Sequence, residues 1–546
     1  MTSLLETKHP YRVLVVLCLV LWLPGFFSLP PGDRDESRFV QASKQMLETG
    51  DFVRIQNGAE ARNRKPIGIH WLQVPFAAAA QAAGLAQDNP VWPYRIPSLL
   101  GGLAAVLATF ALGERLLDRR AALLGAGMLA ASVLLVVEVH IAKTDAALLG
   151  TTTVAMLLLG RAYVAPAGFS RRAAAGFWLA MGLGVLLKGP ITPMVAGLAT
   201  FWLVVADRAR PGGASWLREL RAGWGVPLML LVVIPWFVAI GVATEGRFFS
   251  DAVGGDLGRK LTSGDESHWG PPGLHLLLTV LLVFPASAAL PAGLVWLRRE
   301  TGRAPRFLLA WIVPAWIVFE AAPTKLPHYT LPLYPALCLV LAAGVCALPA
   351  AGAETGGLVR RRVGRGFALL ACALLTGAAV AAPMVLHVSP GRAWLLAVPA
   401  AIAVPCLGLF ATRATRPERA WAAVLAAPLL YWTVLGWELP RLTPLWISPR
   451  VAAALHPADK VAAVGYAEPS LMVLGGTGIQ FLRTEEAVQA LADGTVDTLV
   501  VGDRDLAAVQ AQAAARAIPL RTDASVQGFN YSRGRAVALS VMRRGS

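Results

Sequence analysis

The sequence predicts an α-helical protein that crosses a membrane many times and carries a small α/β domain at its C-terminal end. Of the 546 residues, 56% are hydrophobic and only 15% are charged, whereas soluble domains contain about 25% charged residues. Apolar stretches of about 17–25 residues, long enough to cross a bilayer of roughly 30 Å, recur along the chain, and arginine-rich loops separate many of them. The same composition excludes a disordered scaffold, which needs low hydrophobicity and high charge.

The first expected span covers residues 11–29. We interpret it as an uncleaved helix, because its apolar core is long and no A-x-A-like cleavage site precedes Pro30. A region dense in charges of both signs follows, up to Pro66. The next apolar stretch, 67–86, contains His70 and other polar residues, so by composition it could either span the bilayer or lie along the interface.

Twelve further stretches are candidate spans. They cover residues 95–113, 121–138, 146–163, 173–188, 190–206, 225–243, 273–296, 307–322, 331–350, 366–386, 393–412 and 420–438.

The distribution of arginine decides how residues 67–86 lie. If this stretch does not span, six short loops on one side of the membrane hold 21 arginines, and the opposite short loops hold only Lys143, Lys188, Lys325 and Arg392. This asymmetry is what the positive-inside rule predicts. We therefore expect thirteen spans, with the N-terminus inside and the C-terminus outside. The net charge of +16 then belongs to cytoplasmic loops and indicates no nucleic-acid partner.

This topology places two long loops, 30–94 and 244–272, and everything after about residue 438 on the outer side. We expect a transmembrane domain over residues 1–445 and an outer α/β domain over 446–546. In the latter, strand-like and helix-like runs alternate. Strands are expected at 460–466, 478–482, 498–502 and 537–542, and helices at 484–492 and 505–517.

Two other patterns carry no chemistry. The stretch from Gly475 to Gly478 is glycine-rich, but no helix start follows it, so it is interpreted as a turn and not as a phosphate loop. The five cysteines all lie in apolar runs without C-x-x-C spacing, which is typical of small buried hydrophobic residues.

Conspicuous polar motifs all fall on the expected outer side. Because charged groups near membrane depth are costly, function is the default hypothesis for them. The motifs are Asp33–Arg38 and Arg62–Lys65 in the first loop, Glu138–His140, Lys143–Asp145, Lys188–Pro190, the charged second loop and Thr324–Tyr329.

Carboxylates beside several fixed cations suit one kind of chemistry. Lysine and arginine hold a phosphate group and stabilise the charge that develops as it leaves, and a carboxylate removes a proton from an attacking hydroxyl. Glycosyl transfer from a lipid-phosphate sugar needs both. Structural alternatives stay open for Asp35 and Glu36 as a helix cap, Lys65 as an interfacial cation, His328 as an interfacial histidine, and Asp145 as the partner of Lys143.

The motifs also resemble a known family. D-E-S-R after the first span and R-K-P-I-G-I-H-W-L later in the same loop resemble the first outer loop of polyprenyl-phosphate-dependent glycosyltransferases of the GT-C fold. Within that fold the motifs resemble the bacterial aminoarabinose transferases acting on lipid A and the wider protein mannosyltransferase group. The stretches K-T-D, L-L-K-G-P, P-W-F and T-K-L-P-H-Y-T-L-P-L-Y-P follow in the same order, so the match covers most of residues 10–340.

The resemblance implies about thirteen spans, juxtamembrane helices in the first outer loop that include residues 67–86, and a cavity at the outer membrane face. It maps catalytic carboxylates onto Asp35, with Glu36 adjacent, and Asp145. The candidates for binding the donor phosphate are Arg38, Lys65, Lys325 and His328. Further candidates are Arg64, Lys143, Lys188, Arg259 and Lys260.

We expect a hexosyl- or pentosyltransferase in a bacterial inner membrane, with its N-terminus cytoplasmic and its C-terminal domain periplasmic. The implied donor is a polyprenyl (undecaprenyl) monophosphate sugar, and the acceptor is lipid A or core saccharide, otherwise another glycolipid or a protein. No cofactor is expected, and no metal is needed because cationic side chains take its place; a divalent ion held by two or three of the carboxylates stays open as an alternative. The alternatives are a transporter or flippase for a lipid-linked anion and a membrane-anchored receptor.

One departure from the family concerns the sugar. Aminoarabinose transferases commonly have F-E-K-P where this chain has Asn63-Arg64-Lys65-Pro66. An acidic residue suits a cationic amino sugar, and arginine does not. We therefore expect a neutral or acidic sugar, such as a hexose or a uronic acid.

Overall fold

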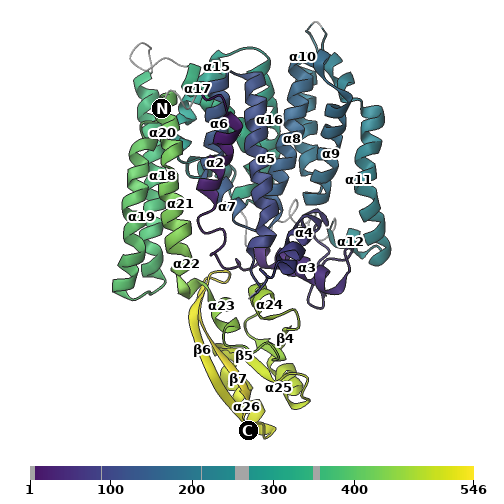
Figure 1. Cartoon of the computed structure of the whole chain (residues 1–546), viewed down its shortest axis with the longest axis vertical. Helices are drawn as coiled ribbons and strands as arrows, with labels where there is room; N and C mark the ends of the chain where they lie inside the picture. Colours follow the sequence, from purple (N-terminus) through teal and green to yellow (C-terminus); the bar gives the residue numbers. More distant parts are fainter. Residues whose placement is uncertain (1–5, 88, 211, 253–269, 348–356, 546) are drawn as a thin grey trace.

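The computed structural model describes residues 6–87, 89–210, 212–252, 270–347 and 357–545. Within these ranges most residues form long helices that run side by side in one bundle, and a small sheet domain follows at one end (Figure 1). We call this end of the bundle the sheet end. Helix α2 begins near the opposite end.

Eight helices among the described residues are long and apolar enough to cross a membrane. They are α5 (Trp92–Leu116), α8 (Thr144–Val164), α11 (Ala222–Ala243), α16 (Arg303–Ala321), η5 with α17 (Pro327–Ala347), α18 (Gly357–Val385), α19 (Pro390–Ala411) and the run α20 to α22 (Pro417–Arg441). A multi-pass α-helical membrane protein is therefore confirmed.

Other apolar helices complete the bundle. Helices α6 (Arg119–Ala131) and α7 (Val133–Val139) form one apolar pair that is bent by 57°. Helices α2 (Pro10–Trp22) and α10 (Ile191–Asp207) are apolar but shorter, and α9 (Arg171–Lys188) packs beside α8 and α11. The total of thirteen spans stays a prediction.

The stretch 273–296 differs from the single span expected there. The chain forms α14 (Leu274–Leu282), a short 3₁₀ turn η4 (Ala286–Ala289) and α15 (Leu290–Arg299). Pro285 lies between the first two elements and cannot donate a backbone hydrogen bond, so a continuous helix is interrupted there.

Two helices of the first loop lie across the sheet end of the bundle: α3 (Asp35–Thr49) and α4 (Gly68–Ala82) (Figure 1). At 15 residues α4 is too short to cross a bilayer, which takes about 20 residues, and it agrees with the juxtamembrane placement expected for 67–86. A Cβ atom on Gly68 would stand 2.6 Å from the carbonyl oxygen of Leu186, so α4 contacts the end of α9 backbone to backbone.

The C-terminal sheet has the order β4-β3-β5-β7-β6. Its strands are β3 (Val461–Val464), β4 (Gln480–Phe481), β5 (Thr498–Gly502), β6 (Leu520–Asn530) and β7 (Arg535–Arg544). Strand β3 runs parallel to β4 and β5, whereas β7 pairs antiparallel with β5 and β6. The four expected strands form, and β6 is an additional one.

Helices cover both faces of this sheet. One face packs against α25 (Thr484–Ala492) and α26 (Asp503–Ala515), through Val464 and Leu499. The other packs against α23 (Ile447–Ala452) and α24 (Pro469–Gly475), through Val461 and Val500. Burial on both faces explains the uninterrupted apolar sequence of β3 and β5. Gly475 ends α24, and the segment after it leads into β4 as a turn, as the sequence predicts.

Candidate functional site

The site is built around the first turn of α3. Glu36 is 4% exposed and accepts from Arg95 Nε at 2.8 Å and Arg95 Nη2 at 3.1 Å. The backbone N–H groups of Ala142 and Gly32 donate to its two oxygens at 2.8 and 2.6 Å. Arg95 also donates to the carbonyls of Leu29 and two neighbours. Glu36 is therefore a fully paired carboxylate that ties the first loop to α5 and to the start of α8.

Asp35 precedes Glu36 but has a different environment. Its side chain is 50% exposed, and the nearest cation is Arg62, with Nη2 4.0 Å from Oδ1. Burial by itself raises the pKa of Asp35, but the charges of Lys65, Arg62 and other nearby cations outweigh it and hold that pKa below its usual range. Asp35 is therefore an ionised carboxylate that faces cations.

Lys65 reaches the site from the segment after a small hairpin, β1 (Gln56–Asn57) and β2 (Glu60–Ala61). Gln45 of α3 bonds both backbone groups of Gly58 in the hairpin turn, at 2.8 and 2.9 Å, and so holds the hairpin against α3. The following segment then returns over Phe39. Lys65 Nζ lies 5.2 Å and Arg62 Cζ lies 4.4 Å from the centroid of that ring.

Lys65 is half-buried as a residue, and protein atoms surround its ammonium closely. Burial, with the like charge of Lys188, lowers its pKa to about 8, and the carboxylates of Asp35 and Asp145 only partly oppose this. An anion that binds beside an ammonium with a lowered pKa compensates its charge and raises that pKa.

A second group of charges lies beside it, where α7, α8, α9 and η5 (Pro327–Leu333) meet. Asp145, in the first turn of α8, accepts from Lys188 at the end of α9 at 2.5 Å, and its other oxygen lies 3.6 Å from Lys143 Nζ. Lys143 Nζ also lies 3.0 Å from Glu138. His328 lies 3.7 Å from Glu138 and 3.8 Å from Asp145. Lys188 Nζ is also 5.4 Å from the Tyr329 ring.

Opposite charges set the protonation of Lys143. Burial acts to lower its pKa, but the carboxylates of Glu138 and Asp145 outweigh this and raise it above the ordinary lysine value. Lys143 is therefore a permanent cation of the site, unlike Lys65.

The structure brings together most of the expected site residues. Asp35, Lys65, Asp145, Lys143, Lys188 and His328 share one field of interacting charges, and half-buried Arg38 contributes to the field at Asp35. Arg64 is exposed. Lys325 is buried and donates to the carbonyl of Ala322 at 2.7 Å. Arg259 and Lys260 lie outside the described residues.

Three further residues contribute to this geometry, of which two, Arg62 and Glu138, belong to the predicted polar motifs but were not named as site candidates. Arg62 lies beside Lys65 over Phe39, and Glu138 pairs with Lys143. Arg95 is 2% exposed and anchors Glu36. The available signal for Arg95 was its position: it is a charged residue at the edge of an apolar stretch, where a functional or structural partner is required.

Comparisons with known proteins agree with this geometry. Residues 32–247 match the family model of dolichyl-phosphate-mannose-protein mannosyltransferases. The chain is 29% identical over 447 residues to an undecaprenyl phosphate-alpha-4-amino-4-deoxy-L-arabinose arabinosyl transferase of Pseudomonas aeruginosa (strain UCBPP-PA14), covering 80% of this chain and 75% of the relative. It is 26% identical to the protein of the same name from Aeromonas salmonicida, covering 78% and 76%.

The fold is also similar to a solved structure. The crystal structure of ArnT from Cupriavidus metallidurans bound to undecaprenyl phosphate superposes with a TM-score of 0.78 at 19% identity, covering 98% of both chains. The sequence similarity over four fifths of the chain and the shared fold support a glycosyltransferase and not a transporter. The protein is therefore a glycosyltransferase that has the fold of ArnT and uses a lipid-phosphate sugar donor, and its sequence is similar to the aminoarabinose transferases.

Proposed function

We propose that the protein transfers a sugar from a polyprenyl monophosphate, of the undecaprenyl type, to lipid A or core saccharide at the periplasmic face of a bacterial inner membrane. The names of the relatives support the donor class, and the resemblance of the sequence motifs to aminoarabinose transferases acting on lipid A supports the acceptor. The arginine-rich loops support a cytoplasmic N-terminus and a periplasmic C-terminal domain.

The charge balance around Lys65 carries the proposal. Five cations act on the described site, Lys65, Arg62, Arg38, Lys143 and Lys188, against three carboxylates, Asp35, Asp145 and Glu138. This excess of positive charge suits the binding of a sugar phosphodiester, which carries a single negative charge. Because Lys65 is partly exposed and its ammonium is the poorly compensated one, we place the donor phosphate there.

The reaction breaks the bond between the anomeric carbon and the donor phosphate oxygen, and the acceptor oxygen bonds to that carbon. The lipid phosphate leaves with the bonding electrons and gains a second negative charge. Lys65, helped by Arg62 and Arg38, stabilises this charge as it develops. Asp145 holds Lys188 in place beside Lys65, and His328 completes the packing of these charges.

Asp35 takes the proton when the acceptor is a hydroxyl group. In the free enzyme its pKa is held low by cations, which makes it a weak base. A bound phosphodiester would neutralise part of that positive field and raise the pKa of Asp35 toward its ordinary value. Donor binding would thus activate the base. An acceptor phosphate, which is already ionised, would need no base.

Substitution of Lys65 tests this function. The purified protein in lipid nanodiscs is incubated with undecaprenyl phosphate sugars and lipid A, and products are identified by mass spectrometry. Lys65→Ala should lower kcat/KM for the donor about 100-fold, whereas the matched control Lys460→Ala, at an exposed position of the sheet domain, should leave it within about twofold. Full activity of Lys65→Ala would contradict the proposal.

The sugar is proposed to be neutral or acidic. Arg64, directly before Lys65, is exposed and places a positive charge where an acidic residue would attract an amino sugar. A panel of hexose-, uronic acid- and aminoarabinose-linked donors tests this, and preferred use of the aminoarabinose donor would disprove it.

A further inference from the structure

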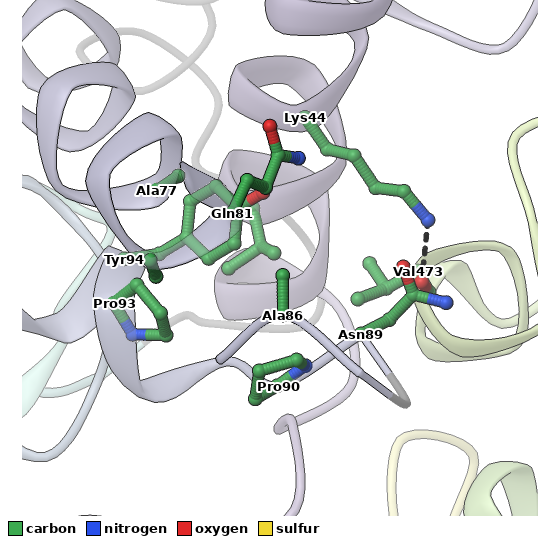
Figure 2. Close-up of a pocket in the computed structure, with 11 residues that line it drawn as sticks. Lys44, Ala77, Gln81, Ala86, Asn89, Pro90, Pro93, Tyr94 and Val473 are labelled. Atoms are coloured by element: carbon green, nitrogen blue, oxygen red, sulfur yellow. Dashed lines mark hydrogen bonds between the residues drawn. The ribbon is translucent and has the colours of Figure 1, made fainter. Parts of the chain in front are cut away.

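Helix α24 of the sheet domain docks along α3, on the face away from the cation cluster. Figure 2 shows the side chain of Lys44 reaching toward Val473, and its Nζ donates to the Val473 carbonyl at 3.0 Å. Asn89 donates to the carbonyl of Leu474 at 3.1 Å. Gln41 of α3 donates to Thr477 Oγ1 at 2.8 Å. Two carbonyls near the C-terminus of α24, those of Val473 and Leu474, therefore find hydrogen-bond donors in the first loop.

The other end of α24 contacts the turn that precedes α3. Ser470, in the first turn of α24, donates its hydroxyl to Asp33 Oδ1. Ser470 is itself held by Ser448, whose Oγ lies 2.6 Å from Ser470 Oγ and 2.9 Å from the Tyr466 hydroxyl. A chain of buried hydroxyls thus connects the interior of the sheet domain to Asp33.

The turn between β6 and β7 contacts Asp33 and the residue after it, Arg34. The N–H of Asp33 donates to the hydroxyl of Tyr531, and the guanidinium of Arg34 donates to the carbonyl of Ser532. Arg34 has a φ of 63°, a backbone conformation that costs a non-glycine residue free energy and persists only where neighbours over-determine it. Here the neighbours are contributed by the sheet domain.

These contacts surround the catalytic candidate. Asp33 and Arg34 are held by the sheet domain, and Glu36 is held by Arg95 of α5. Asp35 lies between them, and among the described residues its side chain has an ion pair with Arg62 at 4.0 Å but no hydrogen bond. The direction of the Asp35 side chain is therefore determined by the residues before and after it. This explains how an ionised carboxylate can remain half exposed opposite the cations and still have a defined position.

We propose that the C-terminal domain is a positioning device for the active site: Ser470 and Tyr531 hold the Asp33–Arg34 turn so that Asp35 faces the reacting sugar and acceptor. This rests on the proposed glycosyl transfer and assigns a role to the domain that the resemblance leaves without one. Both hydroxyls are positioning residues that act through the backbone of the turn and do not touch the substrate.

The experiment uses the full-length protein in nanodiscs and three variants. Ser470→Ala and Tyr531→Phe each remove one hydroxyl, and Ser525→Ala, at an exposed position of β6, is the matched control. Hydrogen–deuterium exchange of the peptide covering residues 32–38 should rise in the first two variants and stay at the wild-type level in the control. With the donor sugar that the wild type accepts, kcat should fall about tenfold while KM for the donor stays within about twofold.

The conservative variant Ser470→Thr retains the hydroxyl and should restore both exchange and kcat. The proposal would be overturned if the peptide covering residues 32–38 exchanged at the wild-type rate in Ser470→Ala and Tyr531→Phe. It would also be overturned if thermal stability and kcat fell together in these variants and Ser470→Thr did not restore them. The exchange measurement needs no turnover. A wild-type protein that transfers no sugar would therefore count against the proposed function alone, and the exchange result would still decide the positioning role.

Discussion

Charged residues that are adjacent in the sequence have different roles in this protein. Asp35 and Glu36 are adjacent, yet one is half exposed and opposed only by cations, whereas the other accepts four hydrogen bonds in a buried ion pair. The sequence predicts both as catalytic candidates. The structure supports a distinct role for each, because Arg95 occupies the oxygens of Glu36 and leaves those of Asp35 accessible.

The lowered pKa of Lys65 predicts a pH dependence of donor use. In the free enzyme the ammonium loses its proton as the pH rises through about 8, and a neutral amine attracts a phosphate only weakly. The value of kcat/KM for the donor, which reports the free enzyme, should therefore fall between about pH 8 and 10. In Lys65→Arg, whose guanidinium stays charged, this decline should be absent, even if the maximum is lower. A wild-type profile that stays flat to pH 10 would count against Lys65 as the phosphate ligand.

The Glu36–Arg95 pair predicts a large effect on stability. Removal of one partner from a buried ion pair leaves an uncompensated charge and costs about 3–5 kcal/mol, so Glu36→Ala should lower the thermal unfolding temperature of the purified protein strongly. Glu60→Ala, at an exposed position of the hairpin, is the matched control and should unfold close to the wild type. Equal unfolding temperatures for the two variants would show that the pair contributes little.

At the scale of elements, the hydrophobic pattern and the length of each apolar stretch predicted the long helices well. Where an observed element differs from the predicted one, the backbone chemistry of particular residues explains the difference. Residues 273–296 are apolar throughout, but Pro285 interrupts the helix within them. Strand β6 was not predicted because most residues from Leu520 to Asn530 are polar or exposed, and its pairing with β7 supplies the hydrogen bonds that pattern alone does not reveal.

For the site, too, the sequence pattern predicted which residues belong together but not their geometry. Motif order predicted that Asp35, Lys65, Asp145 and His328 belong to one outer face, and they share one charge cluster in the structure. The cluster includes residues more than 100 positions apart in the sequence, such as Asp145 and His328. The distances between them, and the anchoring of Glu36 by Arg95, depend on tertiary packing and could not be predicted from the sequence pattern.

Close packing of α5 on α8 predicts a sensitive glycine. A Cβ atom at Gly150 would stand 2.6 Å from the carbonyl oxygen of Gly101, so Gly150→Ala must separate the two helices that carry Arg95 and Asp145. Overpacking of this kind costs about 1–3 kcal/mol. Gly197→Ala, in α10, is the control, because its Cβ would meet no atom within 4 Å. Thermal unfolding in detergent should be lowered only for Gly150→Ala, and equal effects of the two substitutions would contradict a tight α5–α8 contact.

At the scale of the whole molecule, charge and architecture agree on one orientation. The described connections between α10 and α11 and between α15 and α16, which hold eight of the 21 arginines, lie at the end of the bundle away from the sheet domain, whereas α3 and α4 lie at the sheet end (Figure 1). By the positive-inside rule, the arginine-rich end should face the cytoplasm. The +16 net charge thus predicts on which side of the membrane the donor phosphate is used.

Reporter fusions test this orientation without any assumption about the substrate. Alkaline phosphatase, which is active only after export, should be active when fused after the last residue of the sheet domain and inactive when fused after Arg210, between α10 and α11. A fluorescent protein that matures only in the cytoplasm should give the reverse pattern at the same two positions and controls for expression. Because helix α3, which begins at Asp35, lies at the sheet end, an inactive C-terminal phosphatase with a fluorescent C-terminal fusion would place the site in the cytoplasm and contradict transfer at the periplasmic face.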